Sequence, residues 1–259
     1  MQAPIITLVT DWGTSDFFCG MFKGHLLSAL PEARVVDICH EVRACDPLAA
    51  VPFVRHACTA FPEGSIHLID VASTSECQYI VARHEGRYFV CADNGLLYNA
   101  FGCRCECAAR LKAEAVQLGT FIADTLMLPA VVRLAKGERP EQIGTKVEEK
   151  GGTMPLYYNE HGNQLSVTIT HYDAYGNACL GITRQEFERI CAGRRFATKI
   201  PNVPPMTQIM QSYIPAPGSG KIILVESSTG YLQIAMCHRR AEQLLNLDFN
   251  RSVLFEFER

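Results

Sequence analysis

Residues 5–39, IITLVTDWGTSDFFCGMFKGHLLSALPEARVVDIC, decide the fold of the N-terminal half. The apolar, β-branched run IITLVT at 5–10 is typical of a buried strand, and it ends at Asp11. The run FFCGMFKGHLLSALP has apolar residues at helical spacing and stops at Pro31, and RVVDIC at 34–39 predicts a second strand. A strand, a helix and a strand in this order predict two parallel neighbours in one sheet.

The same alternation continues beyond residue 39. Residues 46–62, DPLAAVPFVRHACTAFP, predict a helix, with Pro52 tolerable near its start. Strands are predicted at SIHLIDVA (65–72) and GRYFVCA (86–92), and another helix at 126–137. We therefore expect an α/β domain over residues 1–150, built on a mainly parallel sheet.

The composition changes after the stretch EQIGTKVEEKGGTMPLYYNEHGNQ at residues 141–164. Five short alternating runs separated by Gly, Pro and Asn turns predict strands: LSVTITHYD (165–173), NACLGIT (177–183), KIILVESS (221–228), YLQIAM (231–236) and SVLFEFE (252–258). They predict a smaller, mainly antiparallel β domain over residues 155–259. The fold class is thus α/β followed by β.

Charge and composition exclude several classes of partner. The 259 residues carry a formal charge of −3 and an isoelectric point near 6.2, without a basic run that could neutralise nucleic-acid phosphates. No segment reaches the roughly 20 apolar residues of a membrane span, and no basic n-region precedes an apolar stretch at the N-terminus. We expect a cytoplasmic protein that binds neither nucleic acid nor a membrane.

Twelve cysteines raise the question of a metal site. The densest group, Cys103, Cys105 and Cys107, is spaced C-x-C-x-C and lacks the paired C-x-x-C spacing of structural zinc sites. The other cysteines stand in apolar contexts, where free cysteine behaves as a small hydrophobic residue in a reduced compartment. We expect no metal.

Polar residues follow two predicted strands of the first domain. Asp11 stands where ligands collect in open α/β sheets, and a carboxylate suits the vicinal diol of a ribose. Asp16 falls near the start of the predicted helix, where it could bind ligand or act like an N-cap. Asn94 in ADNGLLYN follows the strand at 86–92, and its Asp-Asn-Gly sequence is equally typical of a plain turn.

A third polar group lies in the second domain. Asp173, Tyr175 and Asn177 in THYDAYGN supply an acid, an aromatic face and a carboxamide within five residues. These groups could bind an ammonium and an adenine ring. A β-turn uses the same residue types, so both interpretations stay open.

The chain resembles the S-adenosylmethionine hydroxide adenosyltransferases, relatives of the fluorinating and chlorinating adenosyl enzymes. Four motifs carry the resemblance, in this order: TDWGTSDFFCGMFKG, ADNGLLYN, YDAYGN and SSTGYLQIA. The resemblance implies an α/β domain followed by a small β-barrel, and a homotrimer with binding sites between subunits. It also implies S-adenosylmethionine as substrate or ligand, with no further cofactor. The resemblance implies Asp11 at the ribose hydroxyls and Asp173 at the methionine amino group. It also implies Tyr175 and Asn177 along the adenine and methionine, with Phe121 and Tyr213 as aromatic walls. The other residues expected against the ligand are Trp12, Asp16 and Asn94. His40 in DICHEV matches a family position and is predicted to be a hydrogen-bonded structural residue.

The chain departs from the family where water is activated. The hydrolases share a D-P-G-V-G-T segment followed by Arg, and an F-H-G-R-D segment; here LIDVASTSECQY places Ala72 at the acid in a gapless alignment, and TFIADT places Ile122 at the His. Asp70 and Asp124 are the candidate catalytic replacements, and Asp124 could instead cap a helix. The sequence therefore leaves two hypotheses: an enzyme that hydrolyses S-adenosylmethionine at C5′, or a catalytically inactive adenosyl-ligand-binding or regulatory protein.

Overall fold

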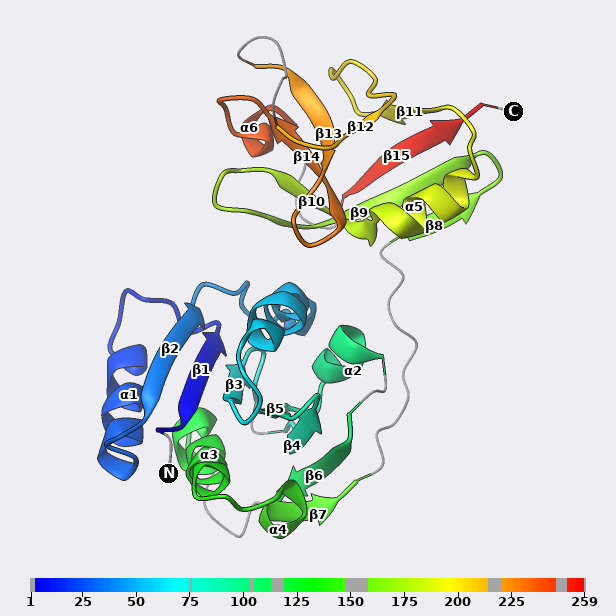
Figure 1. Cartoon of the computed structure of the whole chain (residues 1–259). Coiled ribbons are helices and arrows are strands. Elements are labelled where there is room, and N and C mark those ends of the chain that lie inside the picture. Colours follow the sequence, from blue (N-terminus) through cyan, green and yellow to red (C-terminus); the bar gives the residue numbers. More distant parts are fainter. Residues whose placement is uncertain are drawn as a thin grey trace. The chain divides into compact units, whose positions relative to one another are not determined.

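The computed structural model describes residues 3–74, 76–102, 105–112, 119–147, 158–213, 220–245 and 251–258. The chain divides into two compact units, Met1–Met154 and Pro155–Arg259. The fold is mixed α/β with two sheets, and each unit contains one of them (Figure 1). None of the helices in the described ranges is long and apolar enough to cross a membrane.

A seven-stranded sheet in the order β2-β1-β3-β5-β4-β6-β7 organises the first unit. Its strands are β1 (Ile5–Thr10), β2 (Arg34–Cys39), β3 (Ile66–Asp70), β4 (Tyr79–His84), β5 (Arg87–Ala92), β6 (Cys107–Leu111) and β7 (Gly144–Lys146). Strand β1 pairs in parallel with β2 on one side and with β3 on the other, so the predicted strand–helix–strand unit is confirmed. In the second pairing Thr10 lies opposite Asp70, which brings the ends of β1 and β3 together.

The expectation of a mainly parallel sheet is wrong for its far half. Of six neighbouring pairs, β2–β1, β1–β3 and β3–β5 are parallel, and the remaining three are antiparallel. The change of direction comes from a hairpin in which Glu85 and Gly86 join β4 to β5, with φ of 46° and 73°. Two successive left-handed residues are the backbone of a type I′ turn, whose twist matches that of paired strands.

Helix α1 (Phe18–Ala29) carries the chain from β1 to β2. It buries Cys19, Phe22 and Leu26, which lie three and four residues apart and therefore share one face. The helix expected at 46–62 is present but irregular. It consists of the 3₁₀ helix η1 (Pro47–Ala50), the π-helical η2 (Phe53–Ala57) and the 3₁₀ helix η3 (Cys58–Ala60). Pro52 has no backbone N–H, which is consistent with irregular helical hydrogen bonding around it.

The remaining helical segments of this unit are α2 (Leu96–Phe101), η4 (Ala123–Met127), α3 (Leu128–Ala135) and α4 (Pro140–Ile143). Helix α3 lies within the predicted range 126–137 and buries Leu128, Val131 and Leu134. These side chains join Ile6, Leu8 and Phe22 in one apolar cluster. The sheet and its helices thus provide a rigid support for the loops after β1 and β3.

The second unit contains an eight-stranded sheet that curls into a half-barrel (Figure 1). Its strands are β8 (Tyr158–His161), β9 (Gln164–Tyr172), β10 (Ala178–Thr183), β11 (Phe196–Lys199), β12 (Ile209–Met210), β13 (Ile222–Glu226), β14 (Tyr231–Met236) and β15 (Ser252–Phe257). Strand β9 turns the sheet, because its first half pairs with β8 and β15 and its second half with β10. The five predicted strands are confirmed, and every pair except β12–β13 is antiparallel.

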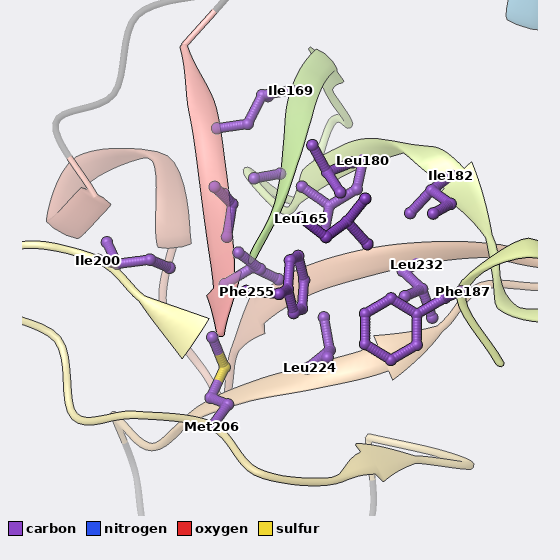
Figure 2. Packing of buried hydrophobic residues seen from close by; sticks show 14 of the residues in the cluster. Leu165, Ile169, Leu180, Ile182, Phe187, Ile200, Met206, Leu224, Leu232 and Phe255 are labelled. Atoms are coloured by element: carbon purple, nitrogen blue, oxygen red, sulfur yellow. The ribbon is translucent and has the colours of Figure 1, made fainter. Parts of the chain in front are cut away.

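Apolar side chains of the half-barrel meet in one core (Figure 2). The rings of Phe187 and Phe255 lie 4.9 Å apart and are almost fully buried, each contributing about 2–3 kcal/mol by removal from water. Phe187 belongs to helix α5 (Arg184–Cys191), which we did not predict. Its signal was present in the sequence: Thr183 and Glu186 form a reciprocal capping box. A second short helix, α6 (Ala241–Leu245), follows β14.

Candidate functional site

Asp11 lies at the carboxyl end of β1, and its carboxylate is held by backbone amides from two other loops. Oδ2 accepts hydrogen bonds from the amides of Cys45, at 3.3 Å, and Ala72, at 3.0 Å. Both donors are non-glycine residues in the left-handed region, with φ of 59° and 54°. Such a conformation costs on the order of 1 kcal/mol for each residue, and this kind of strain clusters at functional sites.

The second carboxylate oxygen of Asp11, Oδ1, has no hydrogen-bond partner within the described ranges. The side chain is half-buried, so this oxygen is oriented and still able to accept. A carboxylate fixed in this way can accept hydrogen bonds from a ligand hydroxyl without first being ordered.

Trp12, the next residue, is the single tryptophan of the chain and links Asp11 to Asp70. Its Nε1 donates a 2.7 Å hydrogen bond to Oδ2 of Asp70. The indole stacks on the ring of His40 at 6.0 Å and meets Phe121 edge-on at 4.9 Å. Trp12 and Phe121, both expected against the ligand, therefore contact one another beside Asp70.

Asp70 ends β3 and is almost fully buried, with 6% of its surface exposed. Its Oδ1 and the hydroxyl of Ser73 are both buried without a hydrogen-bond partner in the described part of the chain. Burial raises the pKa of Asp70. The proximity of the Ser73 hydroxyl and the hydrogen bond from Trp12 oppose this effect, and the negative charge of Asp11 adds to it. A buried acid with a raised pKa and an unused oxygen is a candidate proton acceptor.

Asn94 lies beside this group and serves the loops around it. Its Nδ2 donates to the carbonyl of Val71 at 3.4 Å, and its Oδ1 accepts from the amide of Leu96 at 3.3 Å. The side chain thus ties the loop after β3 to the start of α2. This geometry agrees with the turn interpretation of Asp-Asn-Gly and places Asn94 next to the segment that carries Ala72.

Two further predicted residues have other partners. Asp16 is exposed, and its Oδ1 accepts from the amide of Phe18 at 3.0 Å, as an acid at a helix start does. Asp124 lies 2.8 Å from Nδ1 of His25 on α1. His25 could not be predicted as a partner of Asp124, because the two residues lie 99 positions apart along the chain.

The polar group of the second unit forms the turn between β9 and β10. Oδ1 of Asp173 accepts from the amides of Tyr175 and Asn177, both at 2.9 Å, and Oδ2 accepts from the Asn177 side chain at 2.8 Å. Asn177 is buried, whereas 80% of Tyr175 is exposed. The turn interpretation therefore accounts for Asp173 and Asn177, and the ring of Tyr175 is left free to contact a ligand.

Tyr213 lies near this turn and is held by a residue that we did not predict. Its hydroxyl donates to Oε1 of Gln233 at 2.9 Å, and Nε2 of Gln233 donates to the sulfur of Cys179, also at 2.9 Å. Burial raises the pKa of Tyr213, and the charge of Asp173 raises it further. The ring is 47% exposed, so Tyr213 presents a second aromatic surface in this unit.

Metal ligands do not gather in the described ranges: no three His, Cys, Asp or Glu side chains there are placed to hold an ion. The cysteines that the structure describes are free thiols, and several are buried. Cys103 of the C-x-C-x-C group lies outside the described residues.

Comparison with known proteins identifies the family. The model of the SAM hydroxide adenosyltransferase N-terminal domain matches residues 6–144, and that of the C-terminal domain matches residues 167–254. Together they span most of the chain, which therefore belongs to the S-adenosylmethionine hydroxide adenosyltransferase family, as the motifs predicted.

Individual relatives are distant in sequence and similar in length. The (R)-S-adenosyl-L-methionine hydrolase of Methanocaldococcus jannaschii is 25% identical over 270 residues, covering 95% of this chain and 93% of that protein. A fluorinase of Actinopolyspora mzabensis is 23% identical over 271 residues, covering 90% of each. The crystal structure of an uncharacterized conserved protein from Thermotoga maritima has a TM-score of 0.82 at 19% identity, covering 96% of this chain and 99% of that one, which shows a shared fold.

Proposed function

We propose that this protein binds S-adenosylmethionine and hydrolyses it at C5′ to adenosine and methionine. The observation that carries the proposal is the carboxylate of Asp11. One of its oxygens accepts hydrogen bonds from the backbone amides of two residues in the left-handed conformation, and the other has no partner in the described structure. A ribose presents two neighbouring hydroxyls that can donate to such an acceptor. The hydrolase among the relatives supports the choice of water as the attacking group.

Because the leaving group is neutral, the reaction chiefly requires that the attacking water is positioned in line with the C–S bond and that bulk solvent is excluded. Water attacks C5′, the C–S bond breaks, and its electron pair returns to the sulfonium sulfur, so that methionine leaves with a neutral thioether. The attacking water loses a proton on the way to the adenosine hydroxyl, and a nearby base assists this step. In this proposal Asp70 is the base, since burial raises its pKa toward the working range and its Oδ1 has no protein partner in the described ranges.

The remaining predicted residues have supporting roles in the same proposal. Trp12 and Phe121 would pack against the apolar parts of the ligand, and Asn94 would hold the loop that carries the Ala72 amide. The exposed rings of Tyr175 and Tyr213 would contact adenine or methionine beside the Asp173 turn. Asp16 and Asp124 are engaged with Phe18 and His25, which favours a structural role for both. We also propose a homotrimer with a β-barrel second domain, on the family resemblance, and light scattering of the pure protein tests the assembly.

A second function is favoured by one specific observation. Ile122, which stands where the family has its His, is 6% exposed and packs in the apolar cluster of the first unit. A polar group is therefore missing at that place, and Ala72 supplies an amide where the gapless alignment expects an acid. A protein that binds the adenosyl ligand without hydrolysing it would have the same Asp11 binding group and would lack the same catalytic acid and His.

One experiment separates the two functions. The pure protein is incubated with S-adenosylmethionine, the release of adenosine and methionine is followed by chromatography, and binding is measured by calorimetry. Asp11→Asn removes one charged acceptor, which predicts binding weaker by roughly tenfold to a hundredfold. Glu32→Gln, at an exposed acid of the same unit, is the matched control and is expected to behave like the parent.

Each outcome of this experiment has a direct meaning. Turnover that Asp70→Asn abolishes while binding persists supports the hydrolase with Asp70 as its base. Tight binding without turnover supports the second function. Failure of the parent protein to bind S-adenosylmethionine rejects both.

A further inference from the structure

A chain of polar side chains runs from the surface of the first unit to the end of β1. Nζ of Lys23 lies 2.5 Å from Oδ2 of Asp37, and Oδ1 of Asp37 lies 3.1 Å from Nε2 of His40. The other ring nitrogen of His40, Nδ1, is 2.7 Å from the hydroxyl of Thr10. The four residues come from α1, β2, the loop after β2 and β1, and these elements are neighbours in the first unit (Figure 1).

This arrangement places the His40 ring between a hydrogen bond to Thr10 and the carboxylate of Asp37. Burial acts to raise the pKa of Asp37, but contacts with Lys23 and His40 outweigh it and hold that pKa below its usual range. Asp37 is therefore an anion at neutral pH. Its carboxylate lies 3.1 Å from Nε2 of His40, a buried nitrogen that has no partner in hydrogen-bond geometry within the described ranges. The contact between them is therefore electrostatic, and the hydrogen bond of the ring is the one between Nδ1 and the Thr10 hydroxyl.

His40 in turn borders the segment that carries the candidate site. Its carbonyl accepts from the amide of Gly13 at 2.7 Å, and its ring stacks on Trp12 with an interplanar angle of 21°. Thr10 immediately precedes Asp11, and Trp12 donates to Asp70. The turn with Asp11 is thus held at both ends by one residue that is 6% exposed.

We propose that His40, hydrogen-bonded to Thr10 and close to the anionic Asp37, is a positioning residue for the candidate site. It sets the turn at Asp11 and the plane of the Trp12 indole, and through Nε1 of Trp12 it sets the carboxylate of Asp70. The catalytic part of this inference rests on the function proposed above. The structural part, that the chain of contacts immobilises Trp12, stands independently of any reaction.

Asp37→Asn is the informative variant, because the side chain is 43% exposed and the change keeps its size while it removes the charge and one acceptor oxygen. We expect kcat to fall by on the order of tenfold to a hundredfold, as a small misplacement of reacting groups does. KM should stay within about threefold, because the ligand contacts themselves remain. His40→Phe, which keeps a ring beside Trp12 and removes both nitrogens, should have the same effect, and Glu32→Gln is the control.

The single tryptophan provides a readout that does not depend on turnover. Quenching of Trp12 fluorescence by iodide should rise by about twofold in Asp37→Asn, because a loosened indole is reached more often by solvent. Quenching and kcat equal to those of Glu32→Gln would overturn the proposal, and so would a loss of kcat matched by an equal loss of folded protein. If the parent protein shows no turnover, the proposed function fails, and the quenching result alone then supports or overturns the positioning role.

Discussion

Replacing Gly176 with alanine tests the geometry of the Asp173 turn. Gly176 has φ of 79°, its amide donates to the carbonyl of Asp173, and its carbonyl accepts from Glu242. A Cβ at this position would lie 2.7 Å from Cβ and 3.1 Å from Cα of Arg240. The substitution therefore meets both a conformational and a steric penalty.

A matched control separates the two contributions to the loss of unfolding free energy, backbone strain and steric overlap. Gly162, in the turn between β8 and β9, also has positive φ, at 63°, and a Cβ at that position would have no neighbouring heavy atom within 4 Å. Gly162→Ala should lower the free energy of unfolding by about 1 kcal/mol through backbone strain alone. Gly176→Ala should add a steric cost of about 1–3 kcal/mol, because the methyl presses on the backbone end of Arg240.

Urea unfolding followed by far-UV circular dichroism measures both variants against the parent. Trp12 lies in the other unit, so its fluorescence is not a substitute for this measurement. Equal losses of stability in the two variants would refute the steric argument and, with it, the described approach of Arg240 to the turn. A loss in Gly176→Ala alone would refute the argument from backbone strain.

Three further predictions concern groups elsewhere in the two units. His67 is fully buried between the hydroxyls of Thr7 and Ser65, and burial lowers its pKa to about 3. Below about pH 6.5 the unfolded chain binds a proton at this histidine that the folded chain does not bind. His67 should therefore lower the free energy of unfolding by about 2 kcal/mol when the pH falls from 7 to 5. Urea titrations at the two pH values should show a smaller loss of stability in His67→Gln than in the parent. For Asp70 the pKa is raised, so stability should fall as pH rises from the range of the unfolded carboxyl through the folded pKa. Asp70→Asn should flatten this decline in urea titrations from about pH 4 to 8, and a slope equal to the parent's would contradict the buried acid. Thr183→Ala removes the cap of α5 and should lower the unfolding free energy by about 1 kcal/mol, measured by urea denaturation; an unchanged value would show that the capping box is not formed in solution.

Part of the fold could be predicted because its signals are local. The buried strand β1, the amphipathic α1 and the alternating runs of the second unit appear in short windows of sequence. The hairpin of β4 and β5 was missed, since Glu85-Gly86 lacks the usual Asn-Gly or Asp-Gly signal of a type I′ turn. That turn makes β4 antiparallel to β5, and β6 and β7 then add two further antiparallel pairs.

The candidate site was predictable only as a set of residues. Asp11 could be placed at the end of a strand, because the apolar run before it ends there. The amides that hold it come from Cys45 and Ala72, 34 and 61 positions away, and both need a left-handed backbone that no local sequence pattern signals in these two residue types. The bond between Trp12 and Asp70 spans 58 positions in the same way.

The sequence by itself determined the strand–helix–strand start, five strands of the second unit (β9, β10, β13, β14 and β15) and membership of the family, because periodicity and motifs are properties of the chain. Tertiary structure alone decided which oxygen of Asp11 is occupied, that Asp70 is buried beside Trp12, and that His40 lies between Asp37 and Thr10. The physical reason is that hydrogen bonds and burial depend on distances between segments remote in sequence. Only the completed sheet brings the ends of β1 and β3 side by side.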